Sequence, residues 1–333
     1  MSLADVVVAL AWVGVTAYAL LGGADFGGGF WDLVAGNVDR GARKRALIER
    51  SIGPLWEANH VWLIFALVVL WTGFPTVFAS IASTLYVPLT AVAFGVILRG
   101  AGFAFRPTVR ELALKRLFGG AFGLSSVITP FFLGAVAGAV ASGRVPPGNA
   151  RGAIFTSWLN PTSLLAGALA VGVCAYLAAV YLTADARRAG QEDLAEEFRG
   201  KGLCAGVLVG AISLGGLVVL NVDAPRLYAG LTHRGLPLVV ASVLLGFGSL
   251  ALLWRRRYGI VRLTAGLTVV AIIWGWGAGQ YPHLLEPSLT IEAAAAPRAT
   301  LAALLVSLGV GAALVAPSLA WLFVLFQRER RMT

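Results

Sequence analysis

Nine long apolar segments, separated by short charged connections, run through almost the whole chain. A helix needs roughly 20 apolar residues to cross a bilayer. Only 13% of the residues are charged and 58% are hydrophobic, whereas soluble domains carry about 25% charged residues. The sequence therefore predicts an all-α, polytopic membrane protein of about nine transmembrane helices in a single transmembrane domain, 1–333. The expected spans are about 3–34, 54–72, 76–103, 117–142, 160–185, 202–221, 236–254, 261–280 and 299–326.

The basic residues alternate between the two sides of this nine-span plan. Of the 26 Lys and Arg residues, 21 lie on one side, within 40–50, 99–116, 187–201, 255–262 and 328–331. Short cytoplasmic loops carry an excess of Lys and Arg, so the pattern predicts an external N-terminus and a cytoplasmic C-terminus. The net charge of +10 is spread over these loops, which argues against nucleic-acid binding.

Two acidic residues, Asp25 and Glu57, adjoin or interrupt apolar segments. An ionised side chain at the centre of a membrane helix costs roughly 2.5–3.5 kcal/mol on insertion scales, so such residues are functional candidates. In the predicted topology Asp25, Glu57 and Arg99 fall at similar depth in the cytoplasmic half of the membrane. In the alternative, purely structural interpretation, Glu57 lies at the membrane surface and caps the start of a helix.

Further polar residues lie close to this group. Asn59 and His60 follow Glu57, with His60 three residues on and therefore on the same helical face. Carboxylates and histidine can exchange protons when partly buried, which makes Glu57, Asp25, His60 and Asn59 candidates for a proton route. Arg99 and Asp32 are instead candidates for an ion pair or another structural role. The cluster could carry protons, bind a cation or only hold three helices together.

A run of glycines, Gly22, Gly23 and 27–29, surrounds Asp25. Glycines in membrane helices permit close helix approach or local unwinding, so the run indicates tight packing or contact with a partner. A nucleotide-binding loop is excluded, because GxxxxGK[ST] is absent and no strand–turn–helix context is expected.

The inventory of metal ligands is poor, and no metal site is predicted. The chain has three histidines, His60, His233 and His283, and the predicted plan places no two of them on facing helices. Haem is held mainly by His, Met, Cys or Tyr, and the two cysteines, Cys174 and Cys204, form no CxxC pair. The chain itself is therefore expected to bind no haem.

A second distinctive stretch, 274–297, ends the eighth predicted span and crosses the outer face. Its tryptophans and tyrosine suit a membrane interface, but anchoring does not explain the polar pattern that follows. The candidate residues of this motif are Gln280, Tyr281, Pro282, Glu286 and Glu292.

At these stretches the sequence resembles subunit II of cytochrome bd-type quinol oxidases. The matching residues are 23–29, 51–63, 99–106 and 279–291, and the order and nine-span plan cover essentially the whole chain. The run Pro-x-Trp-[Asp/Glu]-x-Asn-x-Val-Trp at 54–62 is the most specific of them, whereas the glycine run alone is weak.

The resemblance implies two four-helix bundles, here about 1–142 and 155–327, plus one peripheral helix within the second half. It also implies a separate subunit I that carries the haems and the quinol site, in a complex of bacterial or archaeal cell membranes that oxidises quinol and reduces dioxygen without pumping protons. Subunit II then supports assembly, and the acid at Glu57 belongs to a cytoplasmic proton route. Trp62, with Trp56, is a candidate for oxygen access or subunit contact. Some family members hold a structural quinone.

The sequence departs from the family pattern at three positions. Ala104 stands where members often have an acid, and Glu57 replaces a common Asp. The run 22–25, which includes Ala24, lacks the first of the two acids that many members carry there. The leading hypothesis is a haem-free, non-catalytic accessory subunit among membrane lipids. The alternatives are a stand-alone ion-coupled transporter that uses Asp25, Glu57 and Arg99, and a purely structural scaffold.

Overall fold

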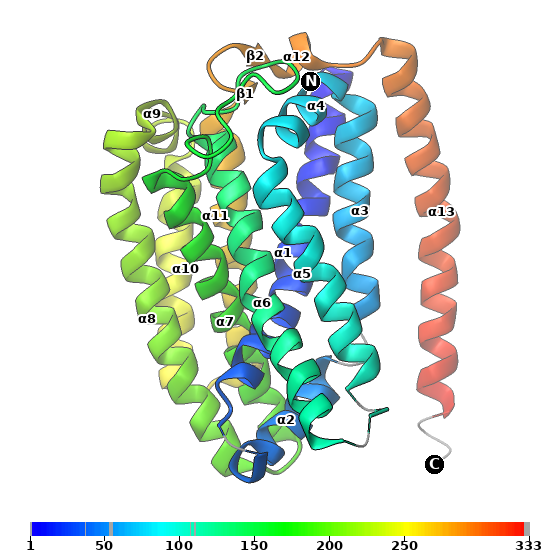
Figure 1. Ribbon diagram of the computed structural model, residues 1–333, viewed down its shortest axis with the longest axis vertical. Coiled ribbons are helices and arrows are strands. Elements are labelled where there is room, and N and C mark those ends of the chain that lie inside the picture. The colour runs from blue at the N-terminus through cyan, green and yellow to red at the C-terminus, as the bar shows by residue number, and fades with distance from the viewer. Residues whose placement is uncertain (1, 37, 53–55, 107, 110, 330–333) are drawn as a thin grey trace.

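The computed structural model describes residues 2–36, 38–52, 56–106, 108–109 and 111–329, and these residues are almost wholly helical. Nine helices run along the long axis of the molecule (Figure 1). They are α1 (Leu3–Leu33), α3 (Trp56–Gly73), α5 (Tyr86–Phe105), α6 (Leu112–Ala141), α7 (Pro161–Arg188), α8 (Glu192–Asp223), α10 (Leu236–Trp254), α11 (Tyr258–Gln280) and α13 (Arg298–Glu329).

Within the described ranges, eight helices are individually long and apolar enough to span a membrane. The described part of α3 from Asn59 to Gly73 passes the same test only together with α4 (Pro75–Thr84), from which it is bent by 117°. The prediction of an all-α, polytopic membrane protein is confirmed.

The predicted third span, 76–103, is wrong at its start. Residues 75–84 form the separate helix α4, and the crossing is made by α5 alone. Pro75 is the first residue of α4, and a proline has no N–H with which to continue the hydrogen bonding of α3. Val77 is buried within the protein, so the apolar character of α4 reflects internal packing, which composition cannot distinguish from contact with lipid.

The predicted basic loop after the first span instead contains a helix, α2 (Val38–Ile52). Leu47 and Ile48 bury themselves against Leu182 of α7 and Phe198 of α8. Two apolar residues in a highly charged run are a weak signal in the sequence, because the surface that covers them comes from segments more than a hundred residues away.

The membrane-spanning helices pack as two groups around α1. On one side α1 packs against α3 and α6, and α6 packs against α5; on the other side α7 packs against α8 and α11, and α10 packs against both of these; α6 and α7 also pack together between the groups. Helix α13 packs against the edge formed by α3 and α1 and stands apart in Figure 1. Because α1 also packs against α7 and α11, its side chains lie between the two groups.

The two ends of the molecule differ. At one end, called the α2 end, lie α2 and the C-terminal end of α13 (Figure 1). At the opposite end lie the N-terminus, α4, α9 (Pro225–Thr232), α12 (Ile291–Ala294) and an antiparallel pair of short strands, β1 (His283–Leu285) and β2 (Leu289–Thr290). The chain therefore has most of its irregular structure at the end predicted to be external.

Candidate proton and ion-pair site

A buried ion pair joins α1 to α5. The Nη2 atom of Arg99 lies 2.5 Å from Oδ1 of Asp25 and 2.9 Å from the Asp25 carbonyl oxygen. Arg99 is fully buried, and Asp25 is 3% exposed. The sequence placed these two residues at similar depth, and the structure brings them into direct contact.

The other contacts of Arg99 come from α6 and α1. Its Nη1 atom donates a hydrogen bond to the Ser126 hydroxyl, which donates in turn to the Phe122 carbonyl. The guanidinium also stacks over the rings of Phe26 and Phe122, at 4.7 and 4.4 Å from their centroids. Aromatic faces attract a cation most strongly where water is excluded, so these contacts offset part of the cost of burying Arg99.

Asp25 is satisfied on one oxygen only. Its Oδ1 accepts from Arg99, while Oδ2 has no hydrogen-bond partner among the described residues. A buried polar atom without a partner is costly, and a carboxylate oxygen has room for further donors. The unpartnered oxygen is therefore a place where a proton can bind.

The glycine run of α1 makes this pair possible. A Cβ added at Gly29 would lie 2.0 Å from the Ser126 hydroxyl and 3.0 Å from Nη1 of Arg99. A Cβ at Gly27 would lie 1.8 Å from the carbonyl oxygen of Cys174 in α7. Because α1 is one continuous helix through this run, the glycines permit close packing and do not unwind it.

The polar residues of α3 lie beside the pair. The side-chain amide of Asn59 donates to the Leu21 carbonyl of α1 at 3.3 Å. The His60 ring lies 6.2 Å from that of Tyr18 and 6.4 Å from that of Phe26. These contacts hold α3 against the face of α1 that carries Asp25.

The side chains of Glu57 and Trp56 lie outside the described residues. Their backbone forms the first turn of α3, directly before Asn59. Trp62 is half-buried on the same helix and contacts the ring of Phe65.

Asp32 belongs to a different cluster from Asp25. It is buried and lies 3.0 Å from Nη1 of Arg106 and 3.3 Å from Nε of Arg45. These contacts link α1 to α2 and to the end of α5, nearer the α2 end than the pair of Asp25 and Arg99. The structure thus places Asp32 and Arg99 in two separate ion-pair clusters, with Asp25 as the acidic partner of Arg99.

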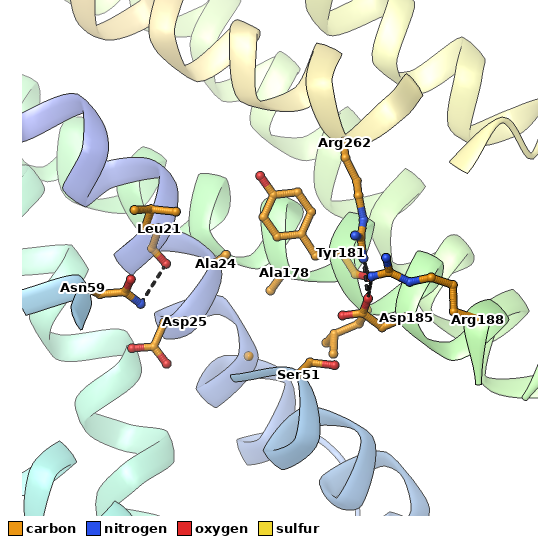
Figure 2. A pocket seen from close by; sticks show the side chains of 12 residues that line it. Leu21, Ala24, Asp25, Ser51, Asn59, Ala178, Tyr181, Asp185, Arg188 and Arg262 are labelled. Carbon is orange, nitrogen blue, oxygen red and sulfur yellow. Dashed lines mark hydrogen bonds and ion pairs between the residues drawn. The ribbon is translucent and has the colours of Figure 1, made fainter. Parts of the chain in front are cut away.

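A cavity of about 390 Å³ reaches Asp25 from the direction of the α2 end. Its walls are Ala24 and Asp25 of α1, Asn59 of α3, and parts of α7 and α11 (Figure 2). Asp185 and Ser51 lie at its other end, beside two arginines of α7 and α11. The cavity thus runs between Asp25 and a charged cluster that extends to the protein surface.

Part of the polar motif of residues 280–292, at the opposite end, has a structural role. Gln280 is buried, accepts a hydrogen bond from the Trp276 indole at 2.6 Å and donates to the Leu284 carbonyl at 2.9 Å. It therefore ties the end of α11 to β1. Glu286 is also buried, in the segment between the two strands.

Three other residues of this motif line a separate cavity. Tyr281, Pro282 and Glu292 surround a space of about 250 Å³ together with Asp5 of α1. Tyr281 and Glu292 are exposed, and this space is distant in sequence and in the fold from the pair of Asp25 and Arg99. The motif and the membrane-core site are two separate places.

The histidines do not form a pair of facing axial ligands. His60 lies in α3, whereas His233 follows α9 and His283 lies in β1, both outside the membrane-spanning helices. Within the part of the chain that the structure describes, no group of three or more His, Cys, Asp or Glu residues could hold a metal ion.

Several residues of the site were not singled out in the sequence. Ser126 is one of many serines, and only its contact with Arg99 distinguishes it. Asp185 and Arg262 lie at predicted span ends, where charges are expected and carry little information. Only the hydrogen bond from Arg262 to Asp185, which lies 77 residues away in the chain, identifies them as part of the site.

Comparison with known proteins agrees with this architecture. A family model for cytochrome bd terminal oxidase subunit II matches residues 3–326. A chain of the solved bd oxidase from Geobacillus thermodenitrificans superposes with a TM-score of 0.77 at 26% identity, covering 98% of this chain and 99% of that one.

Two relatives match over different lengths. A Bacillus subtilis (strain 168) protein is 20% identical over 98% of this chain and 96% of its own length. Its name is provisional and describes a cytochrome bd menaquinol oxidase subunit II. The Escherichia coli (strain K12) cytochrome bd-I ubiquinol oxidase subunit 2 is 30% identical over 50% of this chain, and only 44% of that protein is aligned. Because the family model covers nearly the whole chain and a solved bd oxidase chain shares its fold from end to end, this protein belongs to the cytochrome bd terminal oxidase subunit II family.

Proposed function

We propose that this chain is the haem-free, non-catalytic subunit II of a membrane complex that oxidises quinol and reduces dioxygen. The observation that carries the proposal is the family match over residues 3–326. The partner is a second chain, subunit I, that carries the haems and the quinol site. The relatives named above include a menaquinol and a ubiquinol oxidase subunit, so the type of quinol is left open, as is a structural quinone in this chain.

The chain supplies protons to its partner from the cytoplasm. In this proposal the α2 end is cytoplasmic and the N-terminus external, as the distribution of basic residues predicts. Protons pass from the α2 end to Asp25, with Glu57, Asn59 and His60 along the route. The cavity that reaches Asp25 and the unpartnered oxygen of that carboxylate support this role.

The same chain also supports assembly of the complex. We place it as one transmembrane domain with bundles of about 1–142 and 155–327, which agrees with the two groups of helices around α1. Trp62 and Trp56 then lie on the helix that contributes to oxygen access or contact with subunit I. The exposed apolar residues Val61, Ile64 and Phe94 of α3 and α5 make this face suitable for lipid or a partner helix.

Purification of the native complex from membranes tests the assignment. We expect a haem-bearing membrane chain to co-purify in equal amount with this protein, and the separated chain to show no haem absorbance. Recovery of the chain without a haem-bearing partner would contradict the proposal. Uptake of Na⁺ or K⁺ by the chain alone in liposomes would favour the transporter alternative.

Substitution of Glu57 tests the proton route. In the assembled complex, Glu57→Gln is expected to lower quinol-driven oxygen consumption by about tenfold or more, because general acid–base groups contribute at least this much when proton transfer limits the rate. Glu192→Gln, an exposed acid at the α2 end, is the matched control and should leave the rate unchanged. Equal rates of oxygen consumption for both variants and the unmodified complex would reject the proton route and support the structural-scaffold alternative.

A further inference from the structure

The turn between α10 and α11 places three consecutive arginines at the α2 end. Residues 255–257 are exposed and directly follow Trp254, the last residue of α10, which is 71% exposed. Leu244 and Phe247 of α10 are also exposed, so this helix presents an apolar face to lipid. Because tryptophan prefers the membrane–water interface, Trp254 marks the level at which α10 leaves the hydrocarbon. The arginines beyond it lie at the level of the lipid headgroups.

One carboxylate faces four arginines at this turn. Oε2 of Glu196 in α8 lies 3.2 Å from Nη2 of Arg256, and the same carboxylate pairs with Arg199. The guanidinium of Arg199 lies 6.0 Å from the ring centroid of the exposed tryptophan. Among the residues that the structure describes, Arg255 and Arg257 form no ion pair. The turn therefore carries an excess of positive charge, and Arg255 and Arg257 are its uncompensated part.

Arg256 has a backbone conformation that glycine adopts more readily. Its φ of 59° lies in the left-handed region, directly after the end of α10, where glycine is the usual residue. In its ion pair with Glu196 the two side chains are 59% and 48% exposed, and exposed pairs contribute little to stability. The contacts of Arg256 within the chain therefore do not offset this conformational cost, which indicates a contact with a ligand outside the chain.

We propose that the turn 254–257 is a binding site for the phosphate group of an anionic phospholipid in the leaflet at the α2 end. Guanidinium groups bind phosphate oxygens through paired hydrogen bonds, and basic clusters next to spanning helices bind anionic headgroups. The acyl chains of this lipid lie along the exposed apolar face of α10. A zwitterionic headgroup fits less well, because its own cation faces the unpaired arginines.

This lipid site is separate from the pair of Asp25 and Arg99. Neither Trp254 nor an arginine of the turn lines the cavity that reaches Asp25. A lipid bound at the turn is therefore independent of proton supply through Asp25 and goes beyond the proposed function.

Fluorescence quenching in the native complex measures which lipid lies next to the turn. In a background with Cys174 and Cys204 replaced by alanine, Gly259→Cys carries a bimane fluorophore. Gly259 is exposed in the first turn of α11 and has open space around it. Phosphatidylcholine nanodiscs receive a small fraction of either phosphatidylglycerol or phosphatidylcholine that is spin-labelled near the headgroup and quenches the fluorophore. The labelled background complex without Gly259→Cys supplies the signal to be subtracted.

We expect phosphatidylglycerol to be enriched at the fluorophore by about tenfold or more over phosphatidylcholine, because each arginine near an anionic headgroup favours it by roughly fivefold. Arg255→Gln with Arg257→Gln should reduce this preference by about tenfold. The matched control is Arg226→Gln with Arg234→Gln, which removes two exposed arginines at the opposite end and should leave the preference unchanged. Mass spectrometry of the intact complex gives a second measurement without a fluorophore, in which the Arg255 and Arg257 double variant should retain fewer anionic phospholipids.

Each result supports or overturns the lipid site. Equal quenching by the two lipids in the unmodified complex, with equal lipid retention by the double variant, overturns it. A preference that the turn variant keeps, or that the opposite-end variant loses equally, reflects the net charge of the protein and also overturns it. Quenching by neither lipid would show that a protein chain covers the turn. Oxygen consumption insensitive to Glu57→Gln would reject proton supply and leave the lipid site standing.

Discussion

The pair of Asp25 and Arg99 allows a structural role to be separated from a role in proton transfer. Arg99→Gln leaves Asp25 as a buried carboxylate without its charged partner, and Asp25→Asn leaves Arg99 as a buried cation. Removing one partner of a buried ion pair typically costs about 3–5 kcal/mol. At about 1.4 kcal/mol per factor of ten, either single change should shift the folding equilibrium by two to four orders of magnitude.

The double variant, Asp25→Asn with Arg99→Gln, removes both charges together. Two neutral amides can still hydrogen-bond to each other and to Ser126, and replacement of a whole buried pair by neutral groups is often close to neutral in stability. We therefore expect the double variant to recover most of the stability that each single variant loses. It has no carboxylate at position 25, however, and cannot bind a proton there.

Two measurements on the purified complex decide between the roles. The half-life of thermal inactivation reports stability, because large membrane complexes unfold irreversibly, and oxygen consumption reports turnover at a temperature where all variants remain folded. A stable but slow double variant supports proton transfer through Asp25. A stable double variant with full oxygen consumption would refute the reasoning and leave the pair a structural link between α1 and α5.

Two further predictions concern helix packing. Gly27→Ala should shorten the half-life of thermal inactivation, at a cost of about 1–3 kcal/mol, because its Cβ would overlap a backbone carbonyl of α7. The control is Gly215→Ala in α8, which should be neutral or slightly stabilising because the space around Gly215 is open. Equal effects of the two substitutions would contradict the packing argument. Gln280→Met should also destabilise the protein, by about 1–3 kcal/mol for each group left unsatisfied, because it leaves the Trp276 indole N–H and the Leu284 carbonyl without their partner. An unchanged half-life of thermal inactivation would show that water replaces both hydrogen bonds.

Much of the candidate site could be predicted from the sequence, but its connections could not. An acid and an arginine in apolar segments are unusual enough to identify Asp25 and Arg99 individually, and the nine-span plan placed them at one depth. The same signals made Asp32 a candidate for an ion pair, but its partners, Arg106 and Arg45, are known only from the structure. Depth along a helix follows from residue number, whereas the rotation of each helix about its axis depends on packing between helices.

The sequence by itself determined the class of protein and a plan of about nine apolar segments, of which eight to nine are candidate spans among the described residues, because the bilayer imposes length and hydrophobicity on each segment separately. Only the tertiary structure decided that α4 is separate from α5, that α2 is a helix covered by α7 and α8, and that Asp185 and Arg262 meet at one end of a cavity leading to Asp25. These features depend on contacts between segments that lie far apart in the chain. The physical reason is that burial by lipid and burial by protein leave the same apolar pattern in a sequence, and only the folded structure distinguishes them.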